Sequence, residues 1–218
     1  MSVDQIEMAL RPPETPMVPY PPKYVDLKDG RKLVIHQVGR EAVPTLLKVV
    51  EPLIKREADF YDIVAARVYS ELLGFYRYRV KDEFVLVGTI DGVVAGLVNQ
   101  RMVDQKTAMS YHTLAVKRGL RVGPALFAAK MEYSLDYLGQ EEVLIVAESP
   151  HGLRRWMQEY DLIPRFDTWH ELGGGPSFVL TKELWEKKKA EKNVGIRPVP
   201  QELLETAKKL IIPNALEV

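Results

Sequence analysis

The residue types most suited to binding and chemistry lie in one stretch, residues 111–127, which reads Tyr-His-Thr-Leu-Ala-Val-Lys-Arg-Gly-Leu-Arg-Val-Gly-Pro-Ala-Leu-Phe. A strand-like run leads into a short loop with two glycines, and Pro124 then favours the start of a helix. A helix N-terminus offers unpaired N–H groups and the positive end of the peptide dipoles, which suits phosphate. A plain structural turn is the alternative. We expect an anion, best a pyrophosphate, to be bound by Arg118 and by the amides of Leu120, Arg121, Val122 and Gly123.

The elements that would position this loop follow from the spacing of apolar residues. In chain order the predicted elements are a strand over 32–38, helices over 43–54 and 58–73, strands over 84–90, 93–98 and 108–116, a helix over 124–138, a strand over 143–147, a helix over 152–160 and strands over 166–172 and 178–180. Asp91-Gly92 between two β-rich runs predicts a tight hairpin. The order indicates an α/β (α+β) domain around one mixed sheet.

Two appended segments flank this domain, which we place at residues 30–182. Six of the fifteen prolines fall between residues 12 and 22. Proline fixes φ and lacks an amide donor, so this stretch is expected to be extended, without helix or strand, within a proline-rich arm at residues 1–29. That arm would lie on its own domain or a neighbour, or bind a proline-recognition module. Residues 183–218 are expected to form a helical arm whose apolar face packs on this chain or on a second subunit, which leaves a homodimer open.

The composition excludes several classes of protein. Hydrophobic residues make up 46% and charged residues 28%, as in soluble globular proteins. Thirty basic residues balance thirty acidic ones, so we expect no nucleic-acid partner, which would need a basic excess. The chain has no cysteine, and its four histidines lie far apart, so we expect no metal. Without a long apolar run or a secretory signal, we expect no membrane partner and a cytoplasmic location.

The loop resembles the phosphate-binding loop of a known family, although GxxxxGK[ST] and GxGxxG motifs are absent. The pattern Arg118-x-x-Arg121-x-Gly123 is similar to the (Gln/Arg)-x-x-Gly-x-(Gly/Ala) motif of the GNAT superfamily of acyl-CoA-dependent N-acetyltransferases. The strand end before it, Leu114-Ala115-Val116, is similar as well, and so is the element order from residue 33 to 180. The resemblance implies a GNAT-like mixed, mainly antiparallel central sheet flanked by helices.

The resemblance also implies an activity, the direct transfer of an acetyl group from acetyl-CoA to an amine. The pyrophosphate of acetyl-CoA would lie on residues 118–123, and its pantetheine arm would follow the backbone of Leu114, Ala115 and Val116. A backbone N–H near the strand end would stabilise the oxyanion. The acceptor would be a small-molecule amine or the amine of a peptide, and the fold does not select between them.

His112 is the candidate base that removes the amine proton. Its segment, His112-Thr-Leu-Ala-Val, resembles the arylalkylamine N-acetyltransferases of that family, in which a histidine here serves in proton removal. Strand alternation would place Ser110, His112, Leu114 and Val116 on one face. An imidazole pKa near 6.5 suits a base at neutral pH. A histidine held by hydrogen bonds within the sheet is the alternative.

Two positions depart from the family pattern. Arg121 stands where the family usually has glycine, and Met157 stands where it commonly has a tyrosine that protonates the leaving thiolate. Methionine cannot donate a proton. Tyr160, three residues on, is the candidate substitute acid, with plain packing as its alternative; the thiolate could also leave without an acid. The alternative function is a catalytically degenerate GNAT-fold module that binds CoA or another ligand without acyl transfer.

Overall fold

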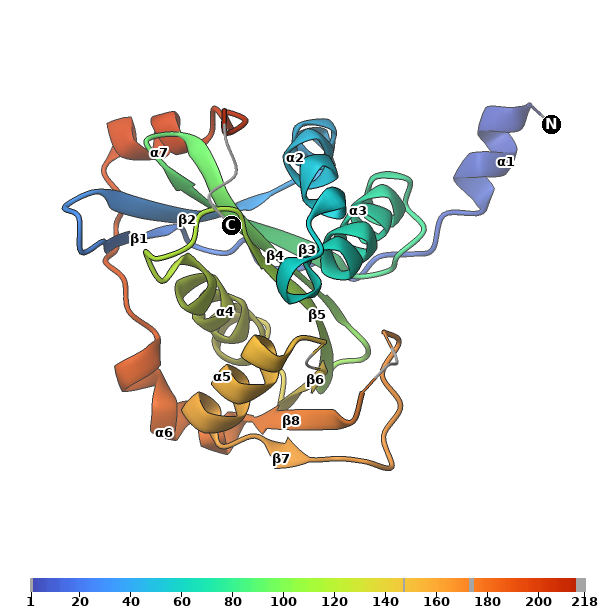
Figure 1. Ribbon diagram of the computed structural model, residues 1–218. Helices are drawn as coiled ribbons and strands as arrows, with labels where there is room; N and C mark the ends of the chain where they lie inside the picture. The colour runs from blue at the N-terminus through green and yellow to red at the C-terminus, as the bar shows by residue number, and fades with distance from the viewer. Residues whose placement is uncertain (1, 147, 173–174, 215–218) are drawn as a thin grey trace.

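The computed structural model describes residues 2–146, 148–172 and 175–214. One sheet forms its centre, with strand order β1-β2-β3-β4-β5-β6-β8-β7 (Figure 1). Neighbouring strands are antiparallel except β5 and β6, which are parallel, so the predicted mixed, mainly antiparallel sheet is confirmed. The strands are β1 (Lys23–Asp26), β2 (Lys32–Val38), β3 (Glu83–Ile90), β4 (Val93–Met102), β5 (Thr107–Ala115), β6 (Glu142–Val146), β7 (Ile163–Pro164) and β8 (Ser177–Thr181).

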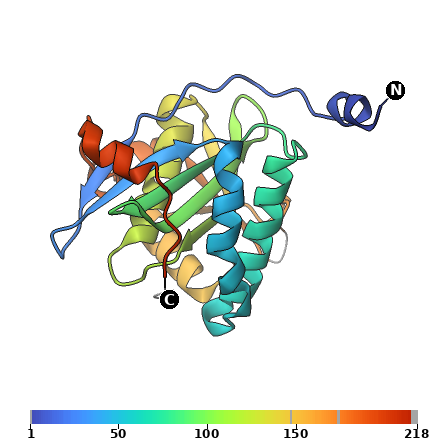
Figure 2. The ribbon, with the colours of Figure 1, turned by 90° about the horizontal axis from the view of Figure 1, so that it is seen from above.

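Helices cover both faces of the sheet. The helices in the described residues are α1 (Val3–Ala9), which does not cover the sheet, α2 (Val43–Val50), α3 (Tyr61–Tyr76), α4 (Val122–Glu132), α5 (Pro150–Tyr160), α6 (Lys182–Lys192) and α7 (Gln201–Ala207). One buried cluster joins α2 and α3 to the sheet, and a second joins α4 to it. Figures 1 and 2 show α2 and α3 side by side, apart from α4 and α5. The fold is thus a helix–sheet–helix sandwich.

The apolar residues of β3 explain this arrangement. Val85 and Val87 pack with α2 and α3, whereas Phe84 and Leu86 pack with α4. Side chains of a strand point alternately to its two faces, so an uninterrupted apolar run requires cover on both. A third buried cluster, around Trp185, joins α4, α5 and α6 over β6 and β8.

The predicted Asp-Gly hairpin joins β3 to β4. Asp91 has φ 53° and Gly92 has φ 80°, the two positive values that a type I′ turn requires. A Cβ on Gly92 would also lie 2.7 Å from the carbonyl oxygen of Thr206. The C-terminal segment docks here on its own chain, since the Ile211 N–H donates to the Gly92 carbonyl at 2.8 Å.

The N-terminal arm contains no helix or strand over residues 10–22, as the prolines predict. Before it, α1 stands away from the rest of the molecule (Figure 2), with apolar side chains exposed. At the C-terminal end of the arm, the buried carboxylate of Glu132 holds the chain in place. Glu132 accepts hydrogen bonds from the Tyr20 hydroxyl at 2.6 Å, the Lys23 ammonium at 3.0 Å and the Arg197 guanidinium at 2.9 Å. Three distant parts of the chain therefore meet at one charge.

The predicted strand over residues 166–172 is wrong. The strand that pairs with β8 on this side is the two-residue β7, and a turn follows it, in which the Thr168 N–H donates to the Arg165 carbonyl at 3.0 Å. Phe166 and Trp169 are 75% and 72% exposed. Aromatic residues favour strands, which explains the prediction, but in the described structure no further layer of the fold buries these two side chains. Across the described ranges, no helix has the length and apolar character needed to cross a bilayer.

Candidate active site

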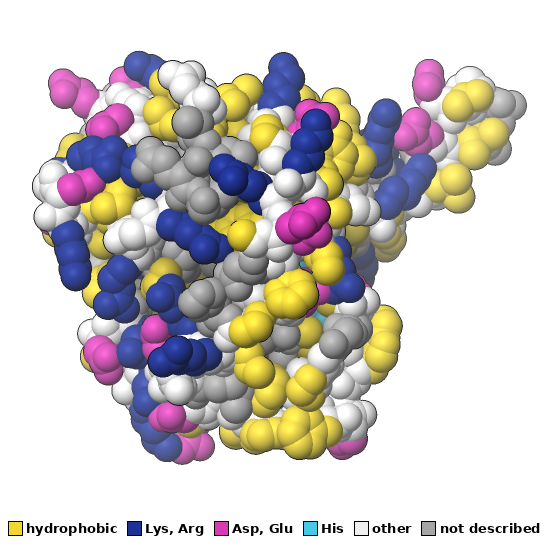
Figure 3. All heavy atoms as spheres, viewed as in Figure 1, with side chains coloured by type: hydrophobic (Ala, Val, Ile, Leu, Met, Phe, Trp, Pro, Cys, Tyr) yellow, Lys and Arg dark blue, Asp and Glu magenta, His cyan; other side chains and the backbone are white. Residues whose placement is uncertain are grey.

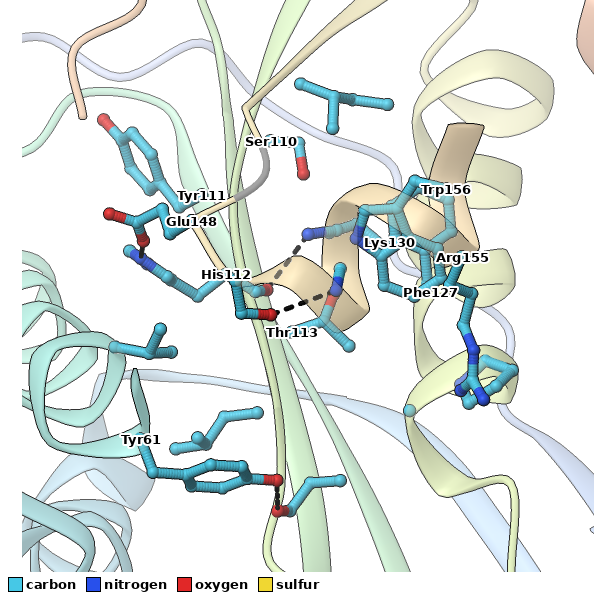
Figure 4. A pocket seen from close by; sticks show the side chains of 18 of the residues that line it. Tyr61, Ser110, Tyr111, His112, Thr113, Phe127, Lys130, Glu148, Arg155 and Trp156 are labelled. Atoms are coloured by element: carbon cyan, nitrogen blue, oxygen red, sulfur yellow. Dashed lines mark hydrogen bonds and ion pairs between the residues drawn. The ribbon is translucent and has the colours of Figure 1, made fainter. Parts of the chain in front are cut away.

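A cavity opens where β5 and β6 separate. The two parallel strands pair only over Thr107–Ser110 of β5, although β5 continues to Ala115. Beyond Ser110, the edge of β5 that faces β6 has no ladder partner among the described residues, although two carbonyls of this stretch, those of His112 and Ala115, accept side-chain hydrogen bonds from Lys130 and Tyr61. The cavity has a volume of about 380 Å³ and lies between β5, the loop after it, α4 and the start of α5 (Figure 4).

A β-bulge in β5 turns His112 toward α3. The register between β4 and β5 shifts by one residue around Asn99, so Tyr111 and His112 together lie opposite it. The alternation predicted for Ser110 and His112 is therefore broken. The backbone N–H of His112 donates to Asn99 Oδ1 at 3.1 Å instead of joining the regular ladder.

The His112 ring lies between two carboxylates. Its Nδ1 is 3.0 Å from Glu71 Oε2, and its Nε2 contacts Glu148 on the cavity wall. Asn99 Nδ2 donates to the same Glu71 oxygen at 2.6 Å, and Arg67 forms an ion pair with Glu148. Both ring contacts are hydrogen bonds when a proton lies on each ring nitrogen or on the facing carboxyl group. The cluster thus holds an exchangeable proton beside the cavity.

A third carboxyl group, that of Glu83, lies deeper. Burial raises the pKa of Glu83 well above its ordinary value, against the opposing effect of a hydrogen bond from Asn99 Nδ2 at 3.1 Å. The side chains of Glu71 and Glu148, in contrast, keep 14% and 11% of their surface exposed. Burial therefore disfavours negative charge at Glu83.

The loop before α4 ends in a left-handed residue. Arg121 has φ 60° and ψ 27°, the region that favours glycine, at the position where the family motif usually has glycine. No side chain caps the helix, and its first turn holds no acidic residue. Pro124 has no N–H, and the amides of Val122 and Gly123 have no acceptor within the helix. The positive end of α4 is left for an external anion.

Cations surround this helix end. Lys117, Arg118, Arg121 and Arg155 line the cavity. The Arg118 guanidinium lies 4.5 Å from the centre of the Tyr61 ring, and the Tyr61 hydroxyl donates to the Ala115 carbonyl at 2.9 Å. On the face shown in Figure 3, Lys and Arg side chains gather on the side of α4 and α6. The net charge of zero conceals this local excess of positive charge.

The structure brings most of the predicted site residues to the cavity. Those that line it are His112, Leu114, Ala115, Arg118, Arg121 and Gly123. The side chains of Val116 and Val122 are buried in the two cores, and Leu120 packs against the second of them. For these three, only the predicted use of the backbone amides remains.

Tyr160 lies away from the cavity lining. It is 1% exposed, packs edge-on against Phe127 with ring centres 5.0 Å apart, and stacks on Trp185 at 6.5 Å. Burial raises its pKa above the ordinary value, so its proton is held more tightly. The side chain of Met157 lies outside the described part of the structure.

Sequence reasoning missed Lys130. It is 1% exposed, lines the cavity from α4, and its Nζ donates to the backbone carbonyl of His112 at 3.0 Å (Figure 4). Burial lowers the pKa of Lys130 to about 7, against an opposing attraction by Glu71. A lysine inside the apolar run Ala-Leu-Phe-Ala-Ala-Lys-Met was the available signal.

The other missed residues are Glu71, Asn99 and Glu148. The first two lie in a helix and a strand far from the loop, with no local pattern to mark them. Glu148 lies two residues after the end of the apolar strand β6, at the mouth of the opening, and that placement could have identified it. In the part of the chain that is described, no group of three or more His, Asp or Glu residues is arranged to hold a metal ion.

No protein-family model matches the sequence, and no curated protein matches it. Solved structures do share the fold. An uncharacterised protein from Bacillus halodurans is 14% identical, with a TM-score of 0.56 over 81% of this chain and 98% of that one. The GNAT domain of S. lividans PAT is 12% identical, with a TM-score of 0.52 over 73% of this chain and 96% of that one. The splayed parallel pair, the helix that begins at Val122 and the likeness to that domain agree: this chain has the GNAT fold.

Proposed function

We propose that the protein is an acetyl-CoA-dependent N-acetyltransferase that acts on the amine of a small molecule or peptide. One observation carries the proposal. The opening between β5 and β6 has an uncapped, cation-rich helix start at one end and an imidazole between two carboxylates at the other. A long ligand with an anionic end and a reactive end fits such a channel.

The residues present fit CoA. The N–H groups at the start of α4, with Arg118 and Arg121, would bind the pyrophosphate. A Cβ on Gly123 would lie 4.0 Å from both the Ala115 Cβ and the Thr113 Cγ2, so glycine keeps the space between the helix start and β5 open. The edge of β5 over Leu114 and Ala115 would pair with the amides of pantetheine as a further strand would, the Ala115 carbonyl through the lone pair that the Tyr61 hydroxyl leaves unused.

His112 would act as the base through the proton that it shares with Glu148. When an amine takes the place of Glu148 at Nε2, the shared proton leaves to solvent, the Glu148 carboxylate keeps its ion pair with Arg67, and the ring nitrogen is free to accept the amine proton. The contact of Nδ1 with Glu71 orients the ring and stabilises the imidazolium that forms. Tyr160, being buried in the core, is assigned to packing.

The second candidate is a CoA-binding module without acyl transfer. The observation that favours it is the occupation of both His112 nitrogens by carboxylates, which leaves no lone pair open until Glu148 moves. The cofactor site would be the same in both cases. Only turnover separates them.

Thermal unfolding with and without acetyl-CoA tests the cofactor. Ligand at about 100 times Kd adds roughly 2.7 kcal/mol, or about 5–10 °C for a chain of this length. A panel of primary amines and free-N-terminal peptides then tests transfer through release of the CoA thiol. His112→Ala should abolish turnover and leave the thermal shift. No shift at millimolar acetyl-CoA in folded protein would refute both candidates, and a shift without turnover on any amine would favour the binding module.

A further inference from the structure

We infer that the Lys130 ammonium is the group that protonates the departing CoA thiolate. This assignment rests on the proposed acetyl transfer and names the proton donor that the sequence lacks at Met157. Three observations carry it: the depth of Lys130 in the cavity, the groups around its Nζ, and the scarcity of other proton donors at that depth.

The depth follows from the two ends of the channel. The helix start at Val122 fixes the phosphate end, and Lys130 lies two turns further along the same helix, about 12 Å at 1.5 Å per residue. Its Nζ reaches the carbonyl of His112, at the point where β5 and β6 come together. A pantetheine arm that follows β5 from the loop toward Ser110 would bring its sulfur to this point.

The surroundings leave the ammonium able to give a proton. One N–H bond is used by the His112 carbonyl, and in the described part of the chain no carboxylate forms an ion pair with Lys130. Its charge is attracted by Glu71 on α3 and acts in turn on His170. Beside it, Phe127 and Trp156 stack with ring centres 4.0 Å apart and close the cavity wall (Figure 4). Burial without a counter-ion favours loss of the proton.

The tyrosine hydroxyls near this depth are already used or lie outside the cavity, and the Ser110 and Thr113 hydroxyls that line it are far weaker acids than an ammonium. The Tyr111 hydroxyl donates to Glu171 at 2.5 Å, and Tyr160 does not line the cavity. A thiol has a pKa of about 8.5, whereas burial brings the pKa of Lys130 to about 7. Proton transfer from Lys130 to a thiolate is therefore downhill.

The step balances in atoms and charge. The amine nitrogen forms a bond to the thioester carbonyl carbon, and His112 takes the proton that the nitrogen loses. The carbon–sulfur bond breaks with its electron pair on sulfur, and the Lys130 ammonium gives a proton to that sulfur and becomes a neutral amine. Products are an amide and CoA thiol, and the proton on His112 returns to Lys130 through solvent.

Lys130→Met tests the assignment, with Lys187→Met on the exposed surface of α6 as the matched control. With acetyl-CoA and an amine accepted by the wild type, we expect kcat to fall about 10²–10⁴-fold, as for loss of a general acid, at little changed affinity for CoA. With an aryl thioester as donor, whose thiolate needs no proton to leave, the deficit should nearly vanish. Lys130→Arg, which keeps the cation but gives up no proton, should behave as Lys130→Met does.

A measurement without turnover separates this inference from the proposed function. The chain has no cysteine, so with the protein in excess over CoA the thiolate absorbance in the ultraviolet reports on bound CoA. The pKa of the CoA thiol should be lower on the wild type than on Lys130→Met, because a nearby ammonium stabilises the thiolate. Equal thiol pKa values, or an equal kcat deficit with both donors, would overturn the assignment. Acetylation of Lys130 itself in the intact protein would also overturn it, by making the residue an acceptor. Failure of the wild type to bind CoA would instead refute the proposed function.

Discussion

Replacing Lys130 by methionine should stabilise the protein at neutral pH. Burial lowers the pKa of this lysine from 10.5 to about 7, so the folded state loses free energy by keeping the ammonium. At about 1.4 kcal/mol per pKa unit the loss at pH 7 is roughly 4–5 kcal/mol. Methionine removes it but leaves the His112 carbonyl without its donor, at a cost of about 1–3 kcal/mol. The expected net gain is roughly 1–4 kcal/mol.

The pH dependence gives the sharper result. Between pH 7 and 10.5 the unfolded chain binds the proton more tightly than the folded chain, so wild-type stability should rise with pH through this range. Urea denaturation at pH 7 and pH 9.5 measures the free energy of unfolding of both proteins. The value for Lys130→Met minus that for the wild type should be about 3 kcal/mol smaller at pH 9.5 than at pH 7. Groups common to both proteins cancel in this difference.

The reasoning fails if Lys130→Met is less stable than the wild type by an amount that does not change with pH. That result would mean that the ammonium of Lys130 is solvated or paired in the folded protein. Lys187→Met, at an exposed position of α6, should leave both the stability and its pH dependence within about 0.5 kcal/mol of the wild type.

Three further changes probe the cofactor loop and the N-terminal arm. Arg121→Gly should be about 1 kcal/mol more stable than Arg121→Ala in urea denaturation, since the position has φ 60°, and both should bind CoA more weakly in calorimetry; equal stabilities would argue against the left-handed conformation. Gly123→Val should fold, with an unchanged circular dichroism spectrum, but lose the thermal shift with acetyl-CoA, because its side chain would fill the space toward Ala115. Glu132→Gln should lower the free energy of unfolding at pH 7 by about 3–5 kcal/mol, because it leaves the buried Lys23 without its counter-charge. Its neighbours, above all Arg197, outweigh burial and hold the pKa of Glu132 at about 2, so the stabilisation is present above pH 4.5 and is lost as the pH falls toward 2; a deficit as large at pH 2.5 as at pH 7 would contradict this.

The sequence predicted most elements because their signals are local. Asp91-Gly92 fixes a type I′ turn through two positive φ values, and the β-rich run Phe84–Ile90 before it predicts the first strand of the hairpin. The helix after the loop was placed from Pro124, and the structure begins it two residues earlier, at Val122. The strand predicted over residues 166–172 is wrong because the prediction rested on local β-propensity alone. The propensity of Phe166 and Trp169 does not show whether another layer of the fold covers them.

The β-bulge opposite Asn99 could not be predicted from the sequence. A one-residue shift in register reverses which face each following side chain takes, and it depends on how β4 and β5 pair rather than on either strand alone. The shift determines that His112 meets Glu71 of α3. Without it, the strand would present the ring to the face covered by α4.

By itself, then, the sequence determined the order of helices and strands and the loop whose arginines and glycines face the cavity, because both depend on neighbours in the chain. The tertiary structure decided the chemistry. It placed two carboxylates on the His112 ring, from α3 and from the second residue after β6, and it buried the Lys130 ammonium beside the His112 carbonyl. The reason is electrostatic: the proton affinity of a side chain depends on the water removed from it and on the charges brought near it, and packing of distant segments sets both.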